Sequence, residues 1–277
     1  MKPNFTVKSY AKAILVGEHA VIRGGKAIIL PVNKFWTELN YNNSNTNKWY
    51  IFGSNNLPKF NSFVDFIKAQ YGEIKGDITI KINCPPESGL GSSATIAVCI
   101  AKLLFFINKI TSNEIYESAR LLENFFHGNS SGADIACVIQ TSPIIFSNNP
   151  TKIEAINIPN KLNLLLWDTN KRFSTKEAIN KVTVQNDAES DKLMTDAVDA
   201  IINAIKQQNI KQIANGMNQA CKCFKNWDLL QNIEQDILYL TNKGAIAVKP
   251  TGGGNGGHLI SLWNQTPDEI LAQGILI

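Results

Sequence analysis

The sequence has few of the residues from which disulfide frameworks and metal centres are built. Its 277 residues include five cysteines, an odd number, and no C-x-x-C pair. This cysteine usage favours reduced thiols over disulfides and indicates a cytoplasmic protein. The three histidines are His19, His127 and His258, and their separations match no metal-ligand spacing. Structural or substrate-orienting roles are therefore favoured over a zinc site.

Long apolar runs and clusters of one charge are also missing. The most apolar window, residues 94–107, is too short to span a bilayer and contains Lys102. Charged residues interrupt the N-terminal segment, so no signal peptide is expected. The net charge is +4 and the lysines are scattered, which suits small anionic substrates and gives no footprint for nucleic acid. We expect small-molecule substrates, with no membrane or nucleic-acid partner; whether the chain is a monomer or a homodimer stays open.

Familiar catalytic signatures are absent as well. The chain contains no G-x-S-x-G elbow, no protein-kinase motif set and no Walker A lysine loop. These absences disfavour α/β-hydrolase, protein-kinase and P-loop chemistry. The length allows one large domain or two smaller ones. The turn at Asn148-Asn149-Pro150 is the candidate boundary, and the predicted domains are residues 1–155 and 156–277.

The stretch that organises the chain is a loop rich in glycine and serine, residues 85–95. It joins an alternating segment, residues 78–83, typical of a strand, to an apolar run at 96–107, typical of a buried helix. Glycine lets a backbone approach a ligand closely, and the first amides of a helix lack intrahelical partners. The loop therefore predicts a phosphate site. Its candidate residues are Pro86, Glu87, Ser88, Gly89, Leu90, Gly91, Ser92, Ser93 and Ala94.

Two other interpretations of this loop stay open. Ser92 or Ser93 could merely cap the helix. Residues 89–94 also fit the dinucleotide pattern G-x-G-x-x-[GA]. That pattern requires an acidic residue roughly 20 positions later, at the end of a second strand. The candidate, Glu114, lies in the helix-like segment 112–125, which counts against a dinucleotide site.

Two further loops carry chemistry. Five glycines lie within residues 252–257, and because each is costly to order, they indicate close backbone approach, with a flexible tip as the alternative. A third loop, residues 127–134, is flanked by Glu123 and Asp134. One carboxylate could hold Mg²⁺ while the other accepts a proton from an attacking hydroxyl. Helix capping by both is the alternative.

The remaining pattern mixes strands and helices. β signal occurs at 5–22 around a polar break, 27–30, 36–41, 49–52, 142–147, 153–158, 162–167, 245–248 and 259–263. Residues 42–48 predict a hairpin loop. Helical patterns cover 61–72, 112–126, 188–240 with breaks near Gln208 and Asn226, and 267–272. Thr175 is a candidate N-cap for a helix that follows it.

Taken in order, these segments resemble the GHMP kinase superfamily of galactokinases, homoserine kinases, mevalonate kinases and phosphomevalonate kinases. Residues 85–95 look like its phosphate loop, 123–134 like its second-carboxylate motif, and 168–177 like a substrate-side segment. Residues 249–257 resemble its C-terminal glycine loop. Residues 12–21 look like the N-terminal motif of the mevalonate kinase branch, which residues 127–129 also resemble. The resemblance extends from residue 12 to residue 257.

The resemblance implies an α+β fold of two domains, with the nucleotide site in the cleft between them and residues 1–155 as the ATP-binding domain. It implies ATP and Mg²⁺ as cofactors and mevalonate as the acceptor. Asp134 would take the proton from the acceptor hydroxyl, and Lys12, close to it, would lower the hydroxyl's pKa and stabilise the transferring phosphoryl group. Ser93 and Glu123 would hold Mg²⁺. The acceptor side would be lined by Glu18, His19, Thr175 and Gly253.

The sequence also departs from the family pattern. Ser9-Tyr10-Ala11 stands where A-P-G is usual before Lys12, and Ser130 replaces a proline. Phe173 replaces a basic residue two positions before Thr175. The glycine loop carries unusual residues at Pro250, Asn255 and His258. Acceptor identity therefore stays open between mevalonate, phosphomevalonate and a sugar. A non-catalytic binder is disfavoured, since a binder has no use for a general base.

Overall fold

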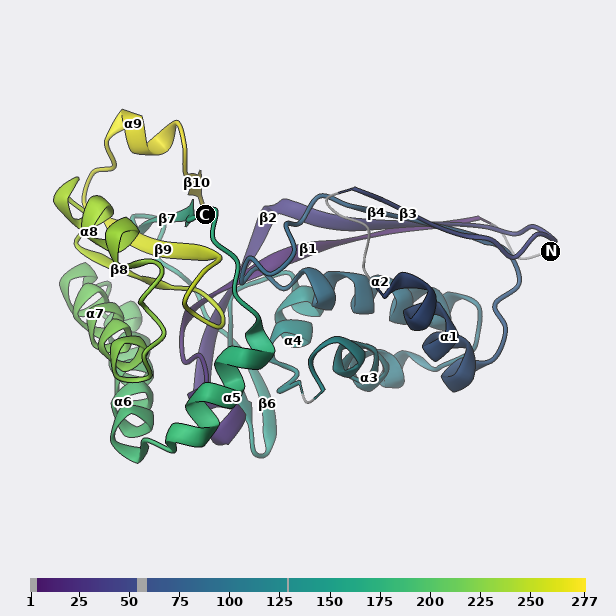
Figure 1. The fold of residues 1–277 in the computed structure, drawn as a ribbon, viewed down its shortest axis with the longest axis horizontal. Helices are drawn as coiled ribbons and strands as arrows, with labels where there is room; N and C mark the ends of the chain where they lie inside the picture. Colours follow the sequence, from purple (N-terminus) through teal and green to yellow (C-terminus); the bar gives the residue numbers. More distant parts are fainter. Residues whose placement is uncertain (1–3, 54–58, 129) are drawn as a thin grey trace. The chain divides into compact units, whose positions relative to one another are not determined.

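The computed structural model describes residues 4–53, 59–128 and 130–277 of the chain (Figure 1). The chain forms two compact units. Unit 1 comprises Met1–Ala11, Asn33–Pro86 and Gly91–Thr141, and unit 2 comprises Lys12–Val32, Glu87–Leu90 and Ser142–Ile277. Each unit is assembled from several segments, and the predicted division into residues 1–155 and 156–277 stays a prediction.

Unit 1 combines a layer of strands with several α-helices (Figure 1). Strand β4 (Asp77–Ile82) pairs in parallel with β3 (Trp49–Gly53) and antiparallel with the second part of β2 (Lys26–Asn42). The first part of β1 (Phe5–Val16) also belongs to this unit. The predicted alternation in β4 is confirmed, because Ile78, Ile80 and Ile82 are all buried.

The helices of unit 1 are α1 (Phe60–Tyr71), α2 (Ser92–Phe106), α3 (Ile115–His127) and α4 (Ala133–Gln140), with the short 3₁₀ helix η2 (Ser112–Glu114) before α3. Helix α2 is central, because residues 94–101 are all buried and it packs against α3 and α4. A helix that is apolar all round belongs in a protein interior. The apolar run that suggested a buried helix is therefore explained by its position.

The predicted hairpin at residues 42–48 is wrong. Strand β3 pairs with β4 and not with β2, so β4 lies between the two strands that the hairpin would have joined. Asp77, the first residue of β4, holds the connection instead. Its carboxylate accepts hydrogen bonds from the Thr46 hydroxyl at 2.7 Å and from the Lys48 N–H at 2.8 Å. The composition of residues 42–48 could not predict these contacts, because Asp77 lies far from them in the sequence.

Two local strand predictions also need correction. The two short strands predicted at 27–30 and 36–41 are parts of the single strand β2. Pro31, which lacks an N–H, falls between the part of β2 that pairs with β5 and the part that pairs with β4. Residues Ala20–Arg23 form a 3₁₀ helix, η1, rather than a strand, and Gly24 ends it in the left-handed conformation.

Unit 2 contains a four-stranded antiparallel sheet in the order β10-β7-β9-β8. These strands are β7 (Asn163–Asp168), β8 (Ala247–Pro250), β9 (His258–Trp263) and β10 (Ile275–Leu276). The end of β1 and the start of β2 also belong here, with β5 (Ile144–Asn148) pairing to β2 and β6 (Thr151–Ala155) pairing to β5. The glycine-rich segment, residues 251–257, is the loop that connects β8 to β9.

The helices of unit 2 are α5 (Thr175–Gln185), α6 (Ala188–Lys206), α7 (Ile210–Asn226), α8 (Glu234–Asn242) and α9 (Asp268–Leu271). The predicted breaks near Gln208 and Asn226 are confirmed. Helix α7 packs against α6 and β8. The predicted cap is displaced by one residue: Ser174 is the N-cap of α5, and its hydroxyl accepts the Glu177 N–H. Thr175 is the first helical residue.

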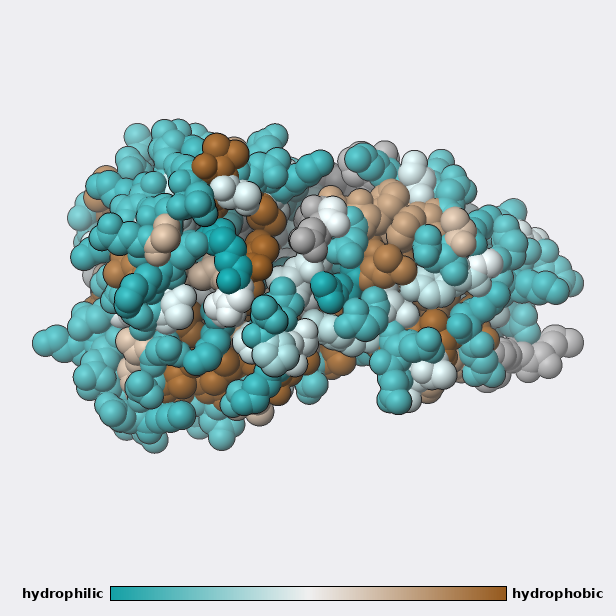
Figure 2. Space-filling model, turned by 90° about the horizontal axis from the view of Figure 1, so that it is seen from below, coloured by the Kyte–Doolittle hydropathy of each residue, from teal (hydrophilic) through white to brown (hydrophobic). Residues whose placement is uncertain are grey.

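Within the described ranges, none of the helices has the length and apolar character needed to cross a membrane. The face drawn in Figure 2 is largely hydrophilic, and apolar residues gather on it only in smaller areas.

Candidate active site

The predicted phosphate loop passes from unit 1 into unit 2 and back, because residues 87–90 belong to unit 2. Gly91 is the N-cap of α2 in the left-handed conformation, with φ 72°, and Ser92 and Ser93 are the first two helical residues. The alternative in which a serine caps this helix is therefore wrong. The N-cap glycine has no side chain, so it leaves the first amides of α2 without a side-chain cap from that position.

The unit 2 part of this loop lies directly against the C-terminal glycine loop. A Cβ atom on Gly89 would overlap the Thr251 carbonyl oxygen, and one on Gly252 would lie 2.8 Å from the Gly89 Cα. A Cβ on Gly257 would lie 2.6 Å from the Ser88 carbonyl oxygen. The glycines therefore serve close backbone approach, as predicted, and what they approach is another loop of the same chain.

His258, one of the departures from the family pattern, strengthens this contact. Its backbone N–H and its ring Nδ1 both lie 3.0 Å from the Ser88 carbonyl oxygen. Burial lowers the pKa of His258, while Asp168 acts in the opposite direction. A neutral ring with the proton on Nδ1 donates to that carbonyl.

Lys12 reaches the same place from β1. Its backbone N–H donates to the Leu90 carbonyl and its Nζ donates to the Gly89 carbonyl, both at 3.0 Å. The residue is only 2% exposed. The predicted catalytic lysine is thus held by both its backbone and its ammonium group at the unit 2 part of the phosphate loop.

The acceptor-side residues of unit 2 also meet. The ring Nε2 of His19 lies 3.0 Å from the Gly253 carbonyl oxygen. A Cβ on Gly253 would lie 3.4 Å from the Thr175 Cα, so the start of α5 packs on the glycine loop. His19, Gly253 and Thr175 are therefore neighbours, although 234 positions separate His19 from Gly253.

Burial determines the charge state of His19. The residue is buried, and its ring meets Phe224 and Trp227 edge-on, with ring centroids 5.8 Å and 5.3 Å away. Burial lowers the pKa of His19 to about 4, and the nearby Arg23 acts in the same direction. The imidazole is therefore neutral at physiological pH.

Glu18, the fourth predicted acceptor residue, is engaged elsewhere. Its Oε1 accepts a hydrogen bond from the Lys249 ammonium, and both side chains are almost completely buried. Burial raises the pKa of Glu18, and Lys249 opposes that shift. Burial lowers the pKa of Lys249, and Glu18 opposes it in turn.

The displaced basic residues of the substrate-side segment are already paired. Arg172 makes a two-point contact with Asp168, at 2.7 Å and 2.9 Å, and Lys171 bonds Asp236 at 2.7 Å. Partial burial alone would raise the pKa of Asp168, but the bonds from Arg172 and the Asn170 N–H outweigh it and the pKa is lowered. Phe173 brings no charge to this segment.

The carboxylate site of unit 1 is built on α3 and α4. Glu123 lies within α3 and is buried, and its Oε2 accepts a hydrogen bond from the Ser130 hydroxyl. The same hydroxyl accepts the Gly132 N–H at 3.1 Å. Asp134 is half-buried in the first turn of α4, whose N-cap is Gly132. The alternative in which both carboxylates are helix caps is therefore wrong, and Asn129 of this motif lies outside the described residues.

Neither Lys249 nor Ser130 was assigned a role from the sequence. Lys249 follows the predicted strand 245–248 directly, and the structure includes it in β8, where a buried lysine needs a partner. Ser130 was visible only as a departure from the family's proline. Its hydroxyl now holds the Glu123 carboxylate, and only the folded loop shows this.

The oxygen donors of unit 1 suit a hard cation. Ser93 is at the start of α2, which packs on the helix that carries Glu123. A hydroxyl and a carboxylate match Mg²⁺, which keeps several waters and is completed by phosphate oxygens. Across the ranges that the structure describes, three or more His, Cys, Asp or Glu side chains nowhere gather into a metal site.

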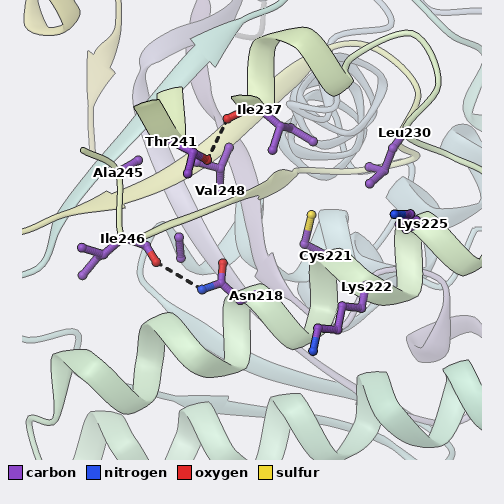
Figure 3. Close-up of a pocket in the computed structure, with 11 residues that line it drawn as sticks. Asn218, Cys221, Lys222, Lys225, Leu230, Ile237, Thr241, Ala245, Ile246 and Val248 are labelled. Atoms are coloured by element: carbon purple, nitrogen blue, oxygen red, sulfur yellow. Dashed lines mark hydrogen bonds between the residues drawn. The ribbon is translucent and has the colours of Figure 1, made fainter. Parts of the chain in front are cut away.

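A hollow of about 250 Å³ lies elsewhere in unit 2, between α7, α8 and β8 (Figure 3). Its lining is mainly apolar, with Cys221 and Val248 on its walls, and the Asn218 amide donates to the Ile246 carbonyl at its edge. No residue predicted for the site lines it.

Known proteins share this architecture. Residues 58–141 match the family model described as the GHMP kinases N terminal domain. The chain is 22% identical to the mevalonate kinase of Aeropyrum pernix over 284 residues, covering 92% of this chain and 87% of that protein. The solved structure of L. major mevalonate kinase in complex with R-mevalonate has a TM-score of 0.81 at 22% identity, over 99% of this chain and 91% of that one. Residues 58–141 therefore match a GHMP kinase N-terminal domain, and the chain as a whole has the fold of the GHMP kinases.

Other branches of the superfamily share the fold as well. Streptococcus pneumoniae phosphomevalonate kinase, solved with phosphomevalonate and AMPPNP, has a TM-score of 0.72 at 16% identity, over 95% of this chain and 93% of that one. The predicted α+β GHMP kinase fold is confirmed. Fold likeness at this identity does not select an acceptor for this chain.

The contact between the two glycine loops should make Gly89 intolerant of any side chain. Gly89→Ala places a Cβ against backbone, whereas Gly24→Ala, also at positive φ, meets no atom within 4 Å. We expect Gly89→Ala to destabilise the protein by about 1–3 kcal/mol more than Gly24→Ala, the usual range for overpacking. Denaturant unfolding of both variants measures this, and equal losses would contradict the packing.

His19 should make stability depend on pH. Its folded pKa of about 4 lies below the unfolded value of 6.5, so the unfolded state binds the proton first. Stability is therefore full above pH 6.5 and is lost as the pH falls towards 4, by roughly 3 kcal/mol. Urea unfolding between pH 7 and 4 should show this extra loss in the wild type and not in His19→Asn. Parallel curves for the two proteins would be inconsistent with a buried neutral ring.

Proposed function

We propose that this GHMP kinase transfers the γ-phosphoryl group of ATP to the primary hydroxyl of mevalonate, giving 5-phosphomevalonate. The observation that carries the proposal is the meeting of His19, Gly253 and Thr175 in unit 2. The resemblance assigned these three residues to the acceptor side independently of one another. The mevalonate kinases among its relatives support the same acceptor.

The paired cations of the substrate-side segment favour mevalonate over phosphomevalonate. Mevalonate carries one carboxylate, whereas phosphomevalonate adds a phosphate that needs further cations. Lys171 and Arg172 are committed to Asp236 and Asp168. The segment therefore offers less positive charge than its composition suggested.

In the proposed reaction, the Asp134 carboxylate accepts the proton of the acceptor hydroxyl. The hydroxyl oxygen forms a bond to the γ-phosphorus as the bond from that phosphorus to ADP breaks. Lys12, held at the phosphate loop, places a buried positive charge where the phosphoryl oxygens gather charge. Such transfer depends on positioning and electrostatics more than on covalent catalysis.

Mg²⁺, when bound, would neutralise charge on the phosphates. Ser93 and Glu123 are the residues proposed to hold it. The Ser130 hydroxyl orients the Glu123 carboxylate, a typical outer-shell contact for a metal ligand. Residues 86–94 would bind the ATP phosphates through the loop backbone and the positive end of the α2 dipole.

A panel of acceptors tests the substrate. ADP release should be measured with ATP and Mg²⁺ on mevalonate, phosphomevalonate, galactose and homoserine, with EDTA as the metal-free control. We expect turnover on mevalonate that EDTA abolishes. Turnover on phosphomevalonate or a sugar, with none on mevalonate, would transfer the assignment to that acceptor.

The general base is tested by Asp134→Asn. An amide has nearly the shape of the carboxylate but cannot take the proton, so kcat should fall by a factor of about 10²–10⁴. ATP binding, followed by fluorescence or calorimetry, should remain within a few-fold of wild type. Near wild-type kcat in this variant would remove Asp134 from the role of base.

A further inference from the structure

Glu18 and Lys249 form a deeply buried ion pair in unit 2. Their side chains are 1% and 0% exposed. The Lys249 ammonium donates to Glu18 Oε1 and to the Pro250 carbonyl, and it lies 3.5 Å from the Ile14 carbonyl oxygen. One ammonium group thus contacts the end of β1, the residue before His19, and the start of the glycine loop.

Neighbouring contacts run between the same segments. The Ile14 N–H donates to the Thr251 hydroxyl at 2.7 Å, one residue beyond Pro250. His19, next to Glu18 in the chain, contacts the Gly253 carbonyl through its ring at 3.0 Å. The ion pair is therefore the charged centre of a network that places both His19 and residues 250–253.

Glu18 itself is poorly placed to contact a substrate. One of its two carboxylate oxygens is taken by Lys249. The other, Oε2, is buried and has no hydrogen-bond partner among the residues that the structure describes. A buried carboxylate in this state depends on its cation, because an uncompensated buried charge is strongly unfavourable.

A buried ion pair is a poor source of net stability, because the loss of hydration offsets most of the attraction. The pair nevertheless requires both of its members, because removing one charge alone destabilises the protein far more than keeping both or removing both. A pair of this kind is suited to holding two segments in one arrangement. Here the two segments are the Glu18-His19 turn and the Lys249-Pro250 entry to the glycine loop.

We propose that Glu18 and Lys249 are positioning residues that set the place of His19 and Gly253, and that Glu18 does not bind the acceptor directly. This inference rests on the proposed function for the identity of the acceptor side. It reassigns Glu18 from the acceptor-contact role that the resemblance implied, and it gives Lys249 a role that the motif alone did not.

The test compares Glu18→Gln, Lys249→Met and the double variant. Each single variant leaves one unpaired buried charge, whereas the double variant leaves none. We expect each single variant to raise the KM for the acceptor at least tenfold with the KM for ATP nearly unchanged. The kcat/KM of the double variant should be at least tenfold higher than that of the worse single variant. If Glu18 contacts the acceptor directly, the double variant will be no better than Glu18→Gln, and the proposal fails.

Amide exchange gives a readout that needs no acceptor. The amides of Thr251, Asn255 and Gly257 are hydrogen-bonded to His258, Leu229 and Lys171 carbonyls, respectively. Their exchange should accelerate at least tenfold in each single variant and slow again in the double variant, while amides of β7 and β9 stay protected. Unchanged exchange in the loop would overturn the positioning role even if mevalonate turnover is confirmed. Loop exchange as expected, without mevalonate turnover, would reject only the proposed acceptor.

Two further variants complete the design. Lys243→Met breaks an ion pair with Glu269 in the same unit whose side chains are 36% and 54% exposed, so it should change neither the KM values nor the loop exchange. If the single variants do not fold, Glu18→Asp retains both charges and shortens one side chain by a methylene. We expect it to fold, with faster loop exchange and a raised acceptor KM. A Glu18→Asp variant identical to wild type in both measurements would overturn the proposal.

Discussion

The candidate site of unit 2 depends on one steric constraint, the contact between the backbones of Gly89 and Gly252. The atoms at this contact leave no space for a Cβ on either residue. The two loops touch through their backbones. This contact fixes the position of the Gly89 carbonyl, which accepts from Lys12, relative to the Thr251 hydroxyl, which accepts from the Ile14 N–H. A larger residue at either position would separate the phosphate loop from the glycine loop, and with them the predicted catalytic lysine from the predicted acceptor side.

Buried polar groups then orient what the glycines bring together. Lys12, Lys249 and His258 each direct a nitrogen at a backbone carbonyl of these loops. These contacts hold the carbonyls in their places within the loops. Burial lowers the pKa of both His19 and His258, and their neutral rings can make these contacts without adding uncompensated charge. The proposed binding of ATP, which is strongly anionic, benefits from a cation that is already held in place, and Lys12 is held in this way by the Gly89 carbonyl.

The parts that sequence reasoning predicted are those with a local cause. The period-two alternation of β4 and the apolar run of α2 each follow from burial of their own residues, and the glycine content of 252–257 follows from a close approach that any glycine cluster suggests. The failures have non-local causes. The connection at 42–48 is organised by Asp77, some thirty residues away, and the Lys249–Glu18 pair joins positions separated by 231 residues. Nothing in the sequence around one residue of each contact identifies its distant partner, so turn composition and spacing could not predict these contacts.

The departures from the family pattern show how such a site tolerates substitution. Ser130 stands where a rigid proline is usual, and it replaces conformational restriction with a hydroxyl that bonds both Glu123 and the Gly132 N–H. His258 stands where a small residue is usual, and it uses its larger ring to bond Ser88. In both cases the new side chain supports a neighbouring loop and leaves Asp134 and Lys12 unchanged. Phe173 differs, because no new charge replaces the basic residue it displaces and the adjacent cations are held by Asp168 and Asp236. The residues proposed for phosphoryl transfer therefore match the family pattern, whereas the segment proposed to face the acceptor departs from it at Phe173 and has its remaining cations paired.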